Sequence, residues 1–499
     1  FGGADKILGA TRDPFGRYVF VGSTTLNNDG IVGRVDANWA YDPSFNGSGK
    51  QVINLGATEI ANSAFVDPTF GKIVITGQSN LNGTPDVMLV RLTGAGAFDA
   101  SFNGIGAALY DLGGSDAGLG VVGVPGNGIV AVGRAKTDAA AIKVIGSSGL
   151  PSSVLVSGST NGNGVQYAPA AGTVGYVTPG TAVELIPGFN GNVRIALADV
   201  NGDGVLDRIA GAGPGGAPRV VVRDGVTNAV ILDFNAFEPT FTGGLYVSAG
   251  DINGDGRAEI VVTPDRGGGA RVLVFDGASA AAGRANPIAN FFGLADLSGV
   301  ADTTFRGGAR TAIGDVNGDG VNDLIVAAGF LGGPRVTVWD GKGVAAANGG
   351  TPTINPLLNF FVFEPTVRDG AFVAAGDVNG DGFADIIAGG GPNGGPRVRI
   401  ADGATLITAG SFGTLDNRLG SVLANFFAGD PNTRGGIRVT ARDVDGDQFA
   451  DVVTGSGDLL LSQIRVYAGT SILATPGDPV TSQTIDPFTQ NLVNGVFVG

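Results

Sequence analysis

Apolar residues in this chain come in short runs, and polar, glycine-rich segments separate these runs. Many runs alternate apolar with polar or small residues, as in VRIALADV at 193–200, LYVSAGDI at 245–252 and AFVAAGDV at 371–378. A period of two is typical of strands with one buried face, and frequent glycines are typical of tight turns. No segment combines a helical period with capping residues. The pattern predicts an all-β protein built from short strands.

The predicted strands recur in a fixed order through the later part of the chain. Each unit has an alternating strand, an acidic nonapeptide, an apolar strand such as LIVAAG, a glycine-rich turn and a third strand that opens with arginine. A variable loop and an aromatic stretch such as NFFVFEP complete the unit. The nonapeptides start at 199, 251, 315, 377 and 443, which gives spacings of 52, 64, 62 and 66 residues. A repeat of this length with four strands is a supersecondary unit that needs neighbours to bury its faces.

The early part of the chain repeats a different unit. RYVFVGST, KIVITGQS and GIVAVGRA place Gly22, Gly77 and Gly133 in register, and the segments after the first two place Phe45 over Phe102. We expect three blades without acidic loops in 1–164, an imperfect junction unit in 165–190 and five blades with acidic loops in 191–499.

Four-stranded units of this kind bury both faces when they stack radially. The fold predicted is therefore all-β, a β-propeller of about eight four-stranded blades (seven to eight). Three early units are too few to close a ring, so we expect one continuous propeller; two separate domains are the alternative. NGVFVG at 494–499 resembles the first strand of a unit, which either closes the ring or leads into further sequence.

Composition narrows the chemistry. Glycine is 89 of 499 residues and 43% of the chain is hydrophobic, which fits a folded protein rich in turns. The chain has no cysteine and no histidine, which excludes thiol nucleophiles, Ser-His-Asp catalysis and histidine-bound zinc. No apolar run is long enough to span a bilayer as a helix. The chain opens FGGADKILG, without Met, so we expect a processed or trimmed chain, in which any export signal would have lain upstream.

The formal net charge is −15, which disfavours nucleic acid as a partner. The five nonapeptides hold 16 of the 45 carboxylates, so much of this acidity is concentrated in five short loops.

The first nonapeptide, DVNGDGVLD, has the pattern of a cation loop. Asp199, Asn201 and Asp203 alternate and turn their oxygens toward a common centre, and Gly204 permits a sharp turn. The Val205 carbonyl and the Asp207 carboxylate complete a cage of hard oxygens, which suits Ca²⁺ better than Mg²⁺. An ordinary ion-free turn is the alternative, but it would hold three carboxylates close together without a counter-charge.

An EF-hand loop begins in the same way but requires a glutamate at position 12 and flanking helices. Position 12 is occupied here by small or apolar residues: Ala210, Val262, Val326, Ala388 and Thr454. The flanking segments are predicted strands. The EF-hand is therefore excluded.

The later units resemble FG-GAP (integrin-α-type) propeller repeats, whose loops follow DxDxDGxxD, from about residue 190 to the end. The early units resemble delta-sixty repeats of bacterial surface proteins through DPSFNGSG and DASFNGIG. The resemblance implies a calcium-binding β-propeller with structural Ca²⁺ in its C-terminal blades, and a secreted or cell-surface protein.

By position, the resemblance implies five structural Ca²⁺ sites, with the seventh residue of each loop contributing its carbonyl. The ligand sets are Asp199, Asn201, Asp203, Val205 and Asp207; Asp251, Asn253, Asp255, Arg257 and Glu259; Asp315, Asn317, Asp319, Val321 and Asp323; Asp377, Asn379, Asp381, Phe383 and Asp385; and Asp443, Asp445, Asp447, Phe449 and Asp451. In the last loop Gln448 replaces the turn glycine, although an extra carboxylate favours the cation.

Three further features have simple structural explanations. The arginines that open the third strands (Arg219, Arg271, Arg335, Arg397 and Arg465) either pair within their own blade or form a basic ring for an anion. The Phe pairs 291–292, 360–361 and 426–427 fit packing between blades. Trp39 and Tyr41 beside a turn are the best candidates for a sugar contact.

No pair of carboxylates outside the nonapeptides has the pattern of a catalytic acid and base. We therefore expect a non-enzymatic, calcium-stabilised propeller, secreted or at the cell surface, that acts in adhesion or as a structural component. Its partner would be a protein or glycan surface ligand, or copies of itself, with no nucleic acid and no membrane insertion. The alternative is a carbohydrate-active propeller, a lectin or a polysaccharide lyase.

Overall fold

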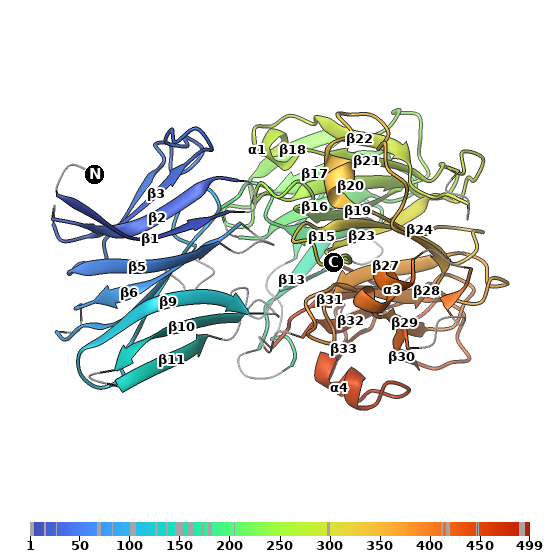
Figure 1. Cartoon of the computed structure of the whole chain (residues 1–499). Coiled ribbons are helices and arrows are strands. Elements are labelled where there is room, and N and C mark those ends of the chain that lie inside the picture. The colour runs from blue at the N-terminus through green and yellow to red at the C-terminus, as the bar shows by residue number, and fades with distance from the viewer. Residues whose placement is uncertain are drawn as a thin grey trace. The chain divides into compact units, whose positions relative to one another are not determined.

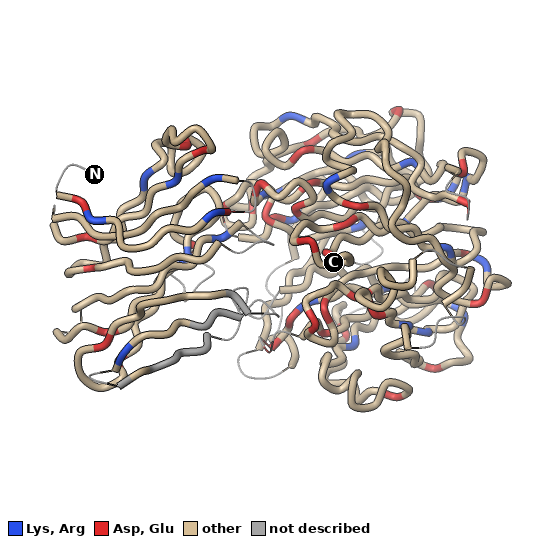
Figure 2. The backbone as a smooth tube through the Cα atoms, in the orientation of Figure 1, with Lys and Arg blue, Asp and Glu red and all other residues tan. Residues whose placement is uncertain are grey.

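The protein is described by a computed structural model. It describes residues 4–488 and 495–499, except 14–15, 26, 67–70, 82, 100–105, 125–127, 136–137, 145–152, 158–162, 171–173, 178–181, 204, 297–299, 411–412, 416–419, 446 and 448. The described residues form nine antiparallel sheets, eight of them four-stranded, so the predicted all-β class is confirmed. Figure 2 marks the charged residues along the backbone, where they are sparse among the other residues.

The chain divides into two compact units. The first unit holds residues 1–150 together with 202–205 and 254–256, and the second unit holds the remainder. The division falls at residue 150, whereas the sequence predicted a boundary after 164.

The first unit contains three sheets, with the strands of each sheet in chain order (Figure 1). The strands are β1 (Asp5–Arg12), β2 (Tyr18–Thr24), β3 (Gly30–Val35) and β4 (Lys50–Ile53); β5 (Glu59–Val66), β6 (Ile73–Ser79), β7 (Asp86–Leu92) and β8 (Ala107–Tyr110); and β9 (Asp116–Val124), β10 (Gly128–Ala135) and β11 (Asp138–Val144). β5 packs against both β1 and β9, so the three sheets lie in sequence against one another.

The glycines aligned in the early repeat lie where a neighbouring strand approaches closely. A β-carbon on Gly22, Gly77 or Gly133 would stand 1.8–1.9 Å from a backbone carbonyl oxygen of the adjacent strand. Each position adjoins a break in the strand register. Phe45 is fully buried, and Phe102, its predicted counterpart, lies outside the described residues.

The second unit contains six four-stranded sheets. Five are consecutive in the chain: β15 (Val193–Ala198), β16 (Asp207–Ala212), β17 (Arg219–Arg223) and β18 (Val230–Asn235); β19 (Leu245–Gly250), β20 (Glu259–Pro264), β21 (Arg271–Phe275) and β22 (Pro287–Phe292); β23 (Ala309–Gly314), β24 (Asp323–Ala328), β25 (Arg335–Trp339) and β26 (Leu358–Phe361); β27 (Ala371–Gly376), β28 (Asp385–Gly390), β29 (Arg397–Ala401) and β30 (Val422–Phe427); and β31 (Ile437–Arg442), β32 (Asp451–Ser456), β33 (Ile464–Tyr467) and β34 (Gln483–Ile485).

The sixth sheet joins the two ends of this unit. It consists of β12 (Val154–Ser157), β13 (Asn163–Tyr167), β14 (Val183–Glu184) and the last strand, β35 (Phe497–Val498), in the order β14-β13-β12-β35. Val498 pairs with Val156, and the N–H of Gly499 donates to the Leu155 carbonyl at 3.0 Å. The described part of NGVFVG, residues 495–499, therefore supplies the first strand of a sheet and closes the ring, which is the first of the two alternatives that the sequence left open.

The first strands of the six sheets form a closed cycle. β15, β19, β23, β27 and β31 contact one another in order, and β35 contacts both β31 and β15. Figure 1 shows the C-terminus among β15, β23, β27 and β31. Antiparallel four-stranded sheets around a closed cycle of inner strands are the architecture of a β-propeller.

The predicted single ring of about eight blades is therefore wrong. The cycle closes within the second unit because β35 supplies the first strand that β12 to β14 lack, and residues 1–150 form a compact unit of their own. The predicted junction unit, 165–190, contains most of β13 and all of β14, the two outer strands of the closing sheet.

In the last four of the five consecutive sheets, a short helix connects the third strand to the fourth. These helices are α1 (Gly277–Ala281), α2 (Gly341–Ala345), α3 (Gly403–Ala409) and α4 (Gly469–Ala474). Asp276, Asp340 and Asp402 cap the first three through hydrogen bonds to the backbone. These helices are five to seven residues long, too short for a helical period to appear, which is why the sequence did not predict them. No helix in the described part of the chain is both long and apolar enough to cross a membrane.

Candidate metal centres

Each acidic nonapeptide begins after the first strand of a sheet and ends at the start of the second strand. The five loops connect β15 to β16, β19 to β20, β23 to β24, β27 to β28 and β31 to β32. Strands therefore flank every loop, as predicted, and the EF-hand stays excluded.

In the third and fourth loops, the first and third side chains turn inward toward the same backbone amide. The N–H of Asp319 donates to Asp315 Oδ1 at 3.1 Å and to Asn317 Oδ1 at 2.9 Å. The corresponding amide of the fourth loop, Asp381, donates to Asp377 at 3.1 Å and to Asn379 at 3.0 Å. These hydrogen bonds gather the first, third and fifth positions around one centre.

The fifth loop brings three carboxylates together. One oxygen each of Asp443, Asp445 and Asp447 lies within 4.8 Å of the others, and all three side chains are half-buried. Three carboxylates at this separation repel one another unless a cation lies between them.

The sixth residue of a loop was predicted to need a left-handed backbone. Gly320 and Gly382 have φ angles of 83° and 89°, in the region that glycine adopts without strain. Gly204 and Gln448, the corresponding residues of the first and fifth loops, lie outside the described residues.

The ninth residue of every loop is a carboxylate with no exposed surface, and backbone amides bind both of its oxygens. One oxygen accepts from the second residue of the loop: Val200 to Asp207 at 2.9 Å, Ile252 to Glu259 at 2.8 Å, Val316 to Asp323 at 3.0 Å, Val378 to Asp385 at 2.8 Å and Val444 to Asp451 at 2.8 Å. The other accepts from a glycine after the third strand: Gly225 at 2.8 Å, Gly277 at 3.3 Å, Gly341 at 3.1 Å, Gly403 at 3.1 Å and Gly469 at 2.9 Å. This carboxylate therefore joins the acidic loop to the following turn of the same sheet.

Burial raises the pKa of the four aspartates among these carboxyl groups, although the backbone hydrogen bonds oppose the shift. The pKa is raised to about 7 for Asp207 and to about 8 for Asp323, Asp385 and Asp451. Burial also raises the pKa of Asp315, Asp377 and Asp447. A divalent cation at the loop would offset this cost because it favours the ionised carboxylates.

The third loop also contacts a lysine. Lys342 Nζ lies 2.8 Å from an Asp319 oxygen, and the lysine side chain is about half exposed. An exposed pair of this kind is worth only about 0–1 kcal/mol, so it would compete weakly with a divalent ion.

The oxygen donors of the third, fourth and fifth loops fit a hard cation such as Ca²⁺. The carbonyls of Val205, Arg257, Val321, Phe383 and Phe449 stay predicted ligands. The tips of the first two loops, 202–205 and 254–256, group with the first unit, so their complete ligand sets also stay predictions.

The arginines at the start of the third strands bind partners both within their own sheets and in the segments that follow the preceding sheet. Arg219 binds both oxygens of Asp233 at 2.6 and 2.7 Å, Arg271 donates to Asn290 at 2.9 Å, and Arg397 donates to Asn425 at 2.8 Å. Arg335 and Arg465 donate to the carbonyls of Ala295 and Ala428. These contacts favour the structural role over a basic ring.

The first phenylalanine of each predicted pair is buried between neighbouring sheets. Phe291 contacts Trp339 of the next sheet edge-on at 5.1 Å, and Phe426 contacts Tyr467 at the same distance. In the first unit Trp39 stacks on Tyr18 at 5.0 Å but remains 73% exposed.

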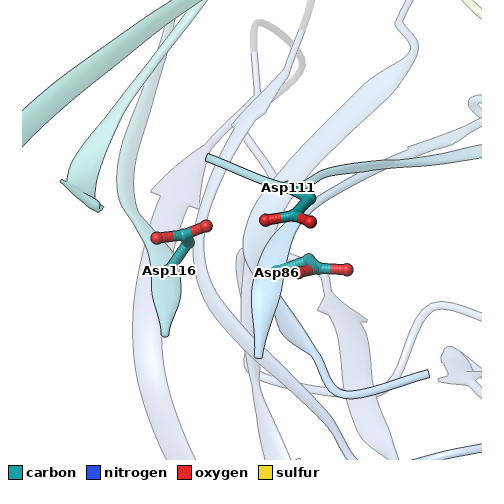
Figure 3. A group of neighbouring side chains, drawn as sticks. All are labelled: Asp86, Asp111 and Asp116. Atoms are coloured by element: carbon teal, nitrogen blue, oxygen red, sulfur yellow. The ribbon is translucent and has the colours of Figure 1, made fainter. Parts of the chain in front are cut away.

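The first unit contains a second acidic group, which the sequence reasoning missed. The carboxylates of Asp86, Asp111 and Asp116 lie together where β7 and β9 begin (Figure 3), each with an oxygen within 4.8 Å of the others. Asn54 and Asp111 accept the amides of Gly56 and Gly113 in the same way, at 2.9 and 2.7 Å. The early blades were predicted to have no acidic loops. The three aspartates of this group do not form a short motif in the sequence, so motif reading did not find them. The only repeated feature nearby is Leu-Gly, which follows both Asn54 and Asp111.

No family model matches the chain. Similar solved structures include Sqt1 from Chaetomium thermophilum, with 13% identity, 91% of this chain and 93% of that chain covered and a TM-score of 0.34. The Dos1 propeller has 10% identity and a TM-score of 0.34, with 97% of this chain and 85% of that chain covered. The rhamnogalacturonan lyase YesW has 12% identity and a TM-score of 0.31, with 77% of this chain and 72% of that chain covered. Similarity at this level carries no argument about function, so the fold assignment rests on the sheet topology.

Proposed function

We propose that this chain is a non-enzymatic, calcium-stabilised β-propeller that acts outside the cell or at its surface, in adhesion or as a structural component. One observation carries the proposal. Five consecutive sheets repeat the same buried ninth carboxylate, bound to the same two backbone positions, at the end of an acidic loop. A catalytic site is built once, whereas a brace recurs in every repeat.

Calcium would act by neutralising the acidic loops. The ninth carboxylate joins the loop to the next turn, and an ion bound by the other side chains would fix the loop between its strands. The resemblance of these loops to FG-GAP repeats supports an extracellular setting, where calcium is abundant.

The proposed partner is a protein or glycan surface ligand, or further copies of this chain. The loops that follow the third strands vary in length and composition between sheets, while the acidic loops keep one length and nearly one sequence. Variable loops on a constant scaffold are where binding surfaces usually lie.

Calcium removal tests the proposal directly. Because an ion that binds only the folded state adds RT ln(1 + [L]/Kd), each site contributes about 2.7 kcal/mol at 100 times Kd. We expect excess EDTA to lower the melting temperature strongly and calcium, but not equal ionic strength from sodium chloride, to restore it. An unchanged melt in EDTA would refute the brace.

A carbohydrate-active propeller is the second candidate, and exposed Trp39, stacked on Tyr18, favours it. Flat exposed aromatic rings provide surfaces on which sugars can pack. Three measurements separate the candidates. Binding on a glycan array that Trp39→Ala abolishes favours the lectin, and release of unsaturated sugars from a polysaccharide favours the lyase. Concentration-dependent assembly, followed by light scattering, favours the structural component.

A further inference from the structure

The centre of the second unit contains a ring of alternating arginine and aromatic side chains. Five of them are the second residues of inner strands, and the sixth is the first residue of β35. In order around the cycle they are Arg194, Tyr246, Arg310, Phe372, Arg438 and Phe497. All but Tyr246, which is half-buried, are at most 8% exposed. We call these six residues the arginine–aromatic ring.

Every neighbouring pair in this ring is in contact. The guanidinium carbon of Arg194 lies 5.0 Å from the Tyr246 ring centroid and 4.6 Å from that of Phe497. For Arg310 the distances are 5.5 Å to Tyr246 and 4.0 Å to Phe372, and for Arg438 they are 5.5 Å to Phe372 and 4.4 Å to Phe497. Cation–π contacts thus hold three positive charges close together in a desolvated place.

The charges are only partly balanced. Arg194 binds Asp265 at 2.8 Å, and Arg438 binds Asp458. Arg310 instead donates to two backbone carbonyls, of Asp369 and Ala371, each at 3.2 Å, and no carboxylate of the described residues pairs with it. One buried guanidinium of the ring therefore lacks a counter-charge.

A cavity of about 350 Å³ opens beside the ring, and all of its lining residues belong to the second unit. It adds a fourth guanidinium, Arg266, which stacks on Phe330 at 3.6 Å. The lining thus has four guanidinium groups against two carboxylates, Asp265 and Asp458. Such an excess of positive charge is unusual in a chain whose formal net charge is −15.

The cavity is also separate from the acidic loops. The ring residues stand near the starts of the inner strands, and the loops follow the ends of those strands. Five residues separate Arg194 from Asp199, which is about 16 Å along an extended strand. The calcium proposal therefore leaves the cavity unexplained.

We propose that this cavity is a binding site for a small organic dianion, such as a dicarboxylate with a short carbon skeleton. The excess of two positive charges matches a dianion, and planar guanidinium groups pair with carboxylates through two parallel hydrogen bonds. Phe330, Phe372 and Phe497 supply apolar surface for the carbon skeleton. Arg310 is the expected primary contact because its charge is unbalanced.

Isothermal titration calorimetry of the whole calcium-loaded chain with succinate tests this site. We expect one succinate per chain, weakened by added sodium chloride and absent with neutral succinamide. Arg310→Gln should weaken binding at least about tenfold, since it removes a charged hydrogen-bond donor. Arg368→Gln removes an equal charge from an exposed arginine outside the cavity and should leave binding unchanged.

Arg266→Gln provides a second test that does not depend on a buried residue. Arg266 is exposed, so this variant should fold normally and bind succinate several-fold more weakly. The proposal is overturned if the wild-type chain shows no succinate binding at millimolar concentration, or if folded Arg310→Gln and Arg266→Gln bind as tightly as wild type. Binding of sulfate alone would also overturn the assignment to a dicarboxylate.

Discussion

A buried carboxylate needs partners for both oxygens, and the ninth residue of each acidic loop finds them in the backbone. Asp385, for example, accepts the amides of Val378 and Gly403 and has no exposed surface. Each oxygen keeps a second lone pair, so these hydrogen bonds are compatible with a cation. This residue therefore joins two segments of the sheet whether or not calcium is bound, whereas Asp381 at the exposed loop tip accepts hydrogen bonds only from Asn379 and Phe383 of its own loop.

Two variants of the fourth loop separate these roles. Asp385→Ala leaves two buried amides without acceptors, at about 1–3 kcal/mol each, and should destabilise the chain with or without calcium. Asp381→Ala removes a predicted ligand at the exposed tip and should lower the melting temperature much more in calcium than in EDTA, where only its hydrogen bonds within the loop are lost. Paired melts in calcium and in EDTA measure both effects; equal losses for Asp381→Ala in the two conditions would contradict its role as a ligand.

At the level of elements, the sheets of the first unit depend on close contact between neighbouring strands. Gly77 of β6 faces the Ile60 carbonyl of β5, where the register of the pair shifts. The same relation recurs at Gly22 and Gly133, which explains why the sequence repeats glycine at this place. Glycine is required at these positions because the strands approach closely where their register shifts, and not because the chain turns there.

Gly77→Ala should therefore be strongly destabilising. Its β-carbon would stand 1.8 Å from a carbonyl oxygen, so the two strands must separate, and overpacking of this kind costs about 1–3 kcal/mol or more. Gly477→Ala is the matched control because a β-carbon there meets nothing within 4 Å. Denaturant unfolding of both variants measures the difference; similar midpoints would show that β5 and β6 adjust without cost.

For the whole molecule, the decisive contact is the one that closes the ring. β35 occupies the first-strand position of the sixth sheet and contacts both β31 and β15. Val496, Phe497 and Val498 are all buried there. In a closed cycle every sheet has a neighbouring sheet on both faces, so no apolar face is left uncovered as it would be at the two ends of an open stack.

Removing residues 496–499 should open this ring. At about 1.5–3 kcal/mol for each buried apolar side chain, the three residues contribute roughly 5–9 kcal/mol. We expect a much lower melting temperature by circular dichroism, and partial recovery when a peptide of residues 494–499 is added, since it can pair with β12. A truncated chain with the wild-type melt would show that the ring does not depend on β35.

The sequence by itself determined the strands, the acidic loops and the packing of the phenylalanine pairs between neighbouring sheets. These follow from period-two patterning and from contacts between residues close in the chain, as between Asp319 and its neighbours at 315 and 317. Only the tertiary structure decided where the ring closes, which arginines gather at its centre and that Asp86, Asp111 and Asp116 meet. β35 pairs with a strand more than 300 residues away, and the arginine–aromatic ring takes one residue from each of six sheets. The sequence does place an arginine or an aromatic residue five positions before each nonapeptide. That these positions converge on one centre depends on how the sheets pack around one another, which residues close in the chain do not determine.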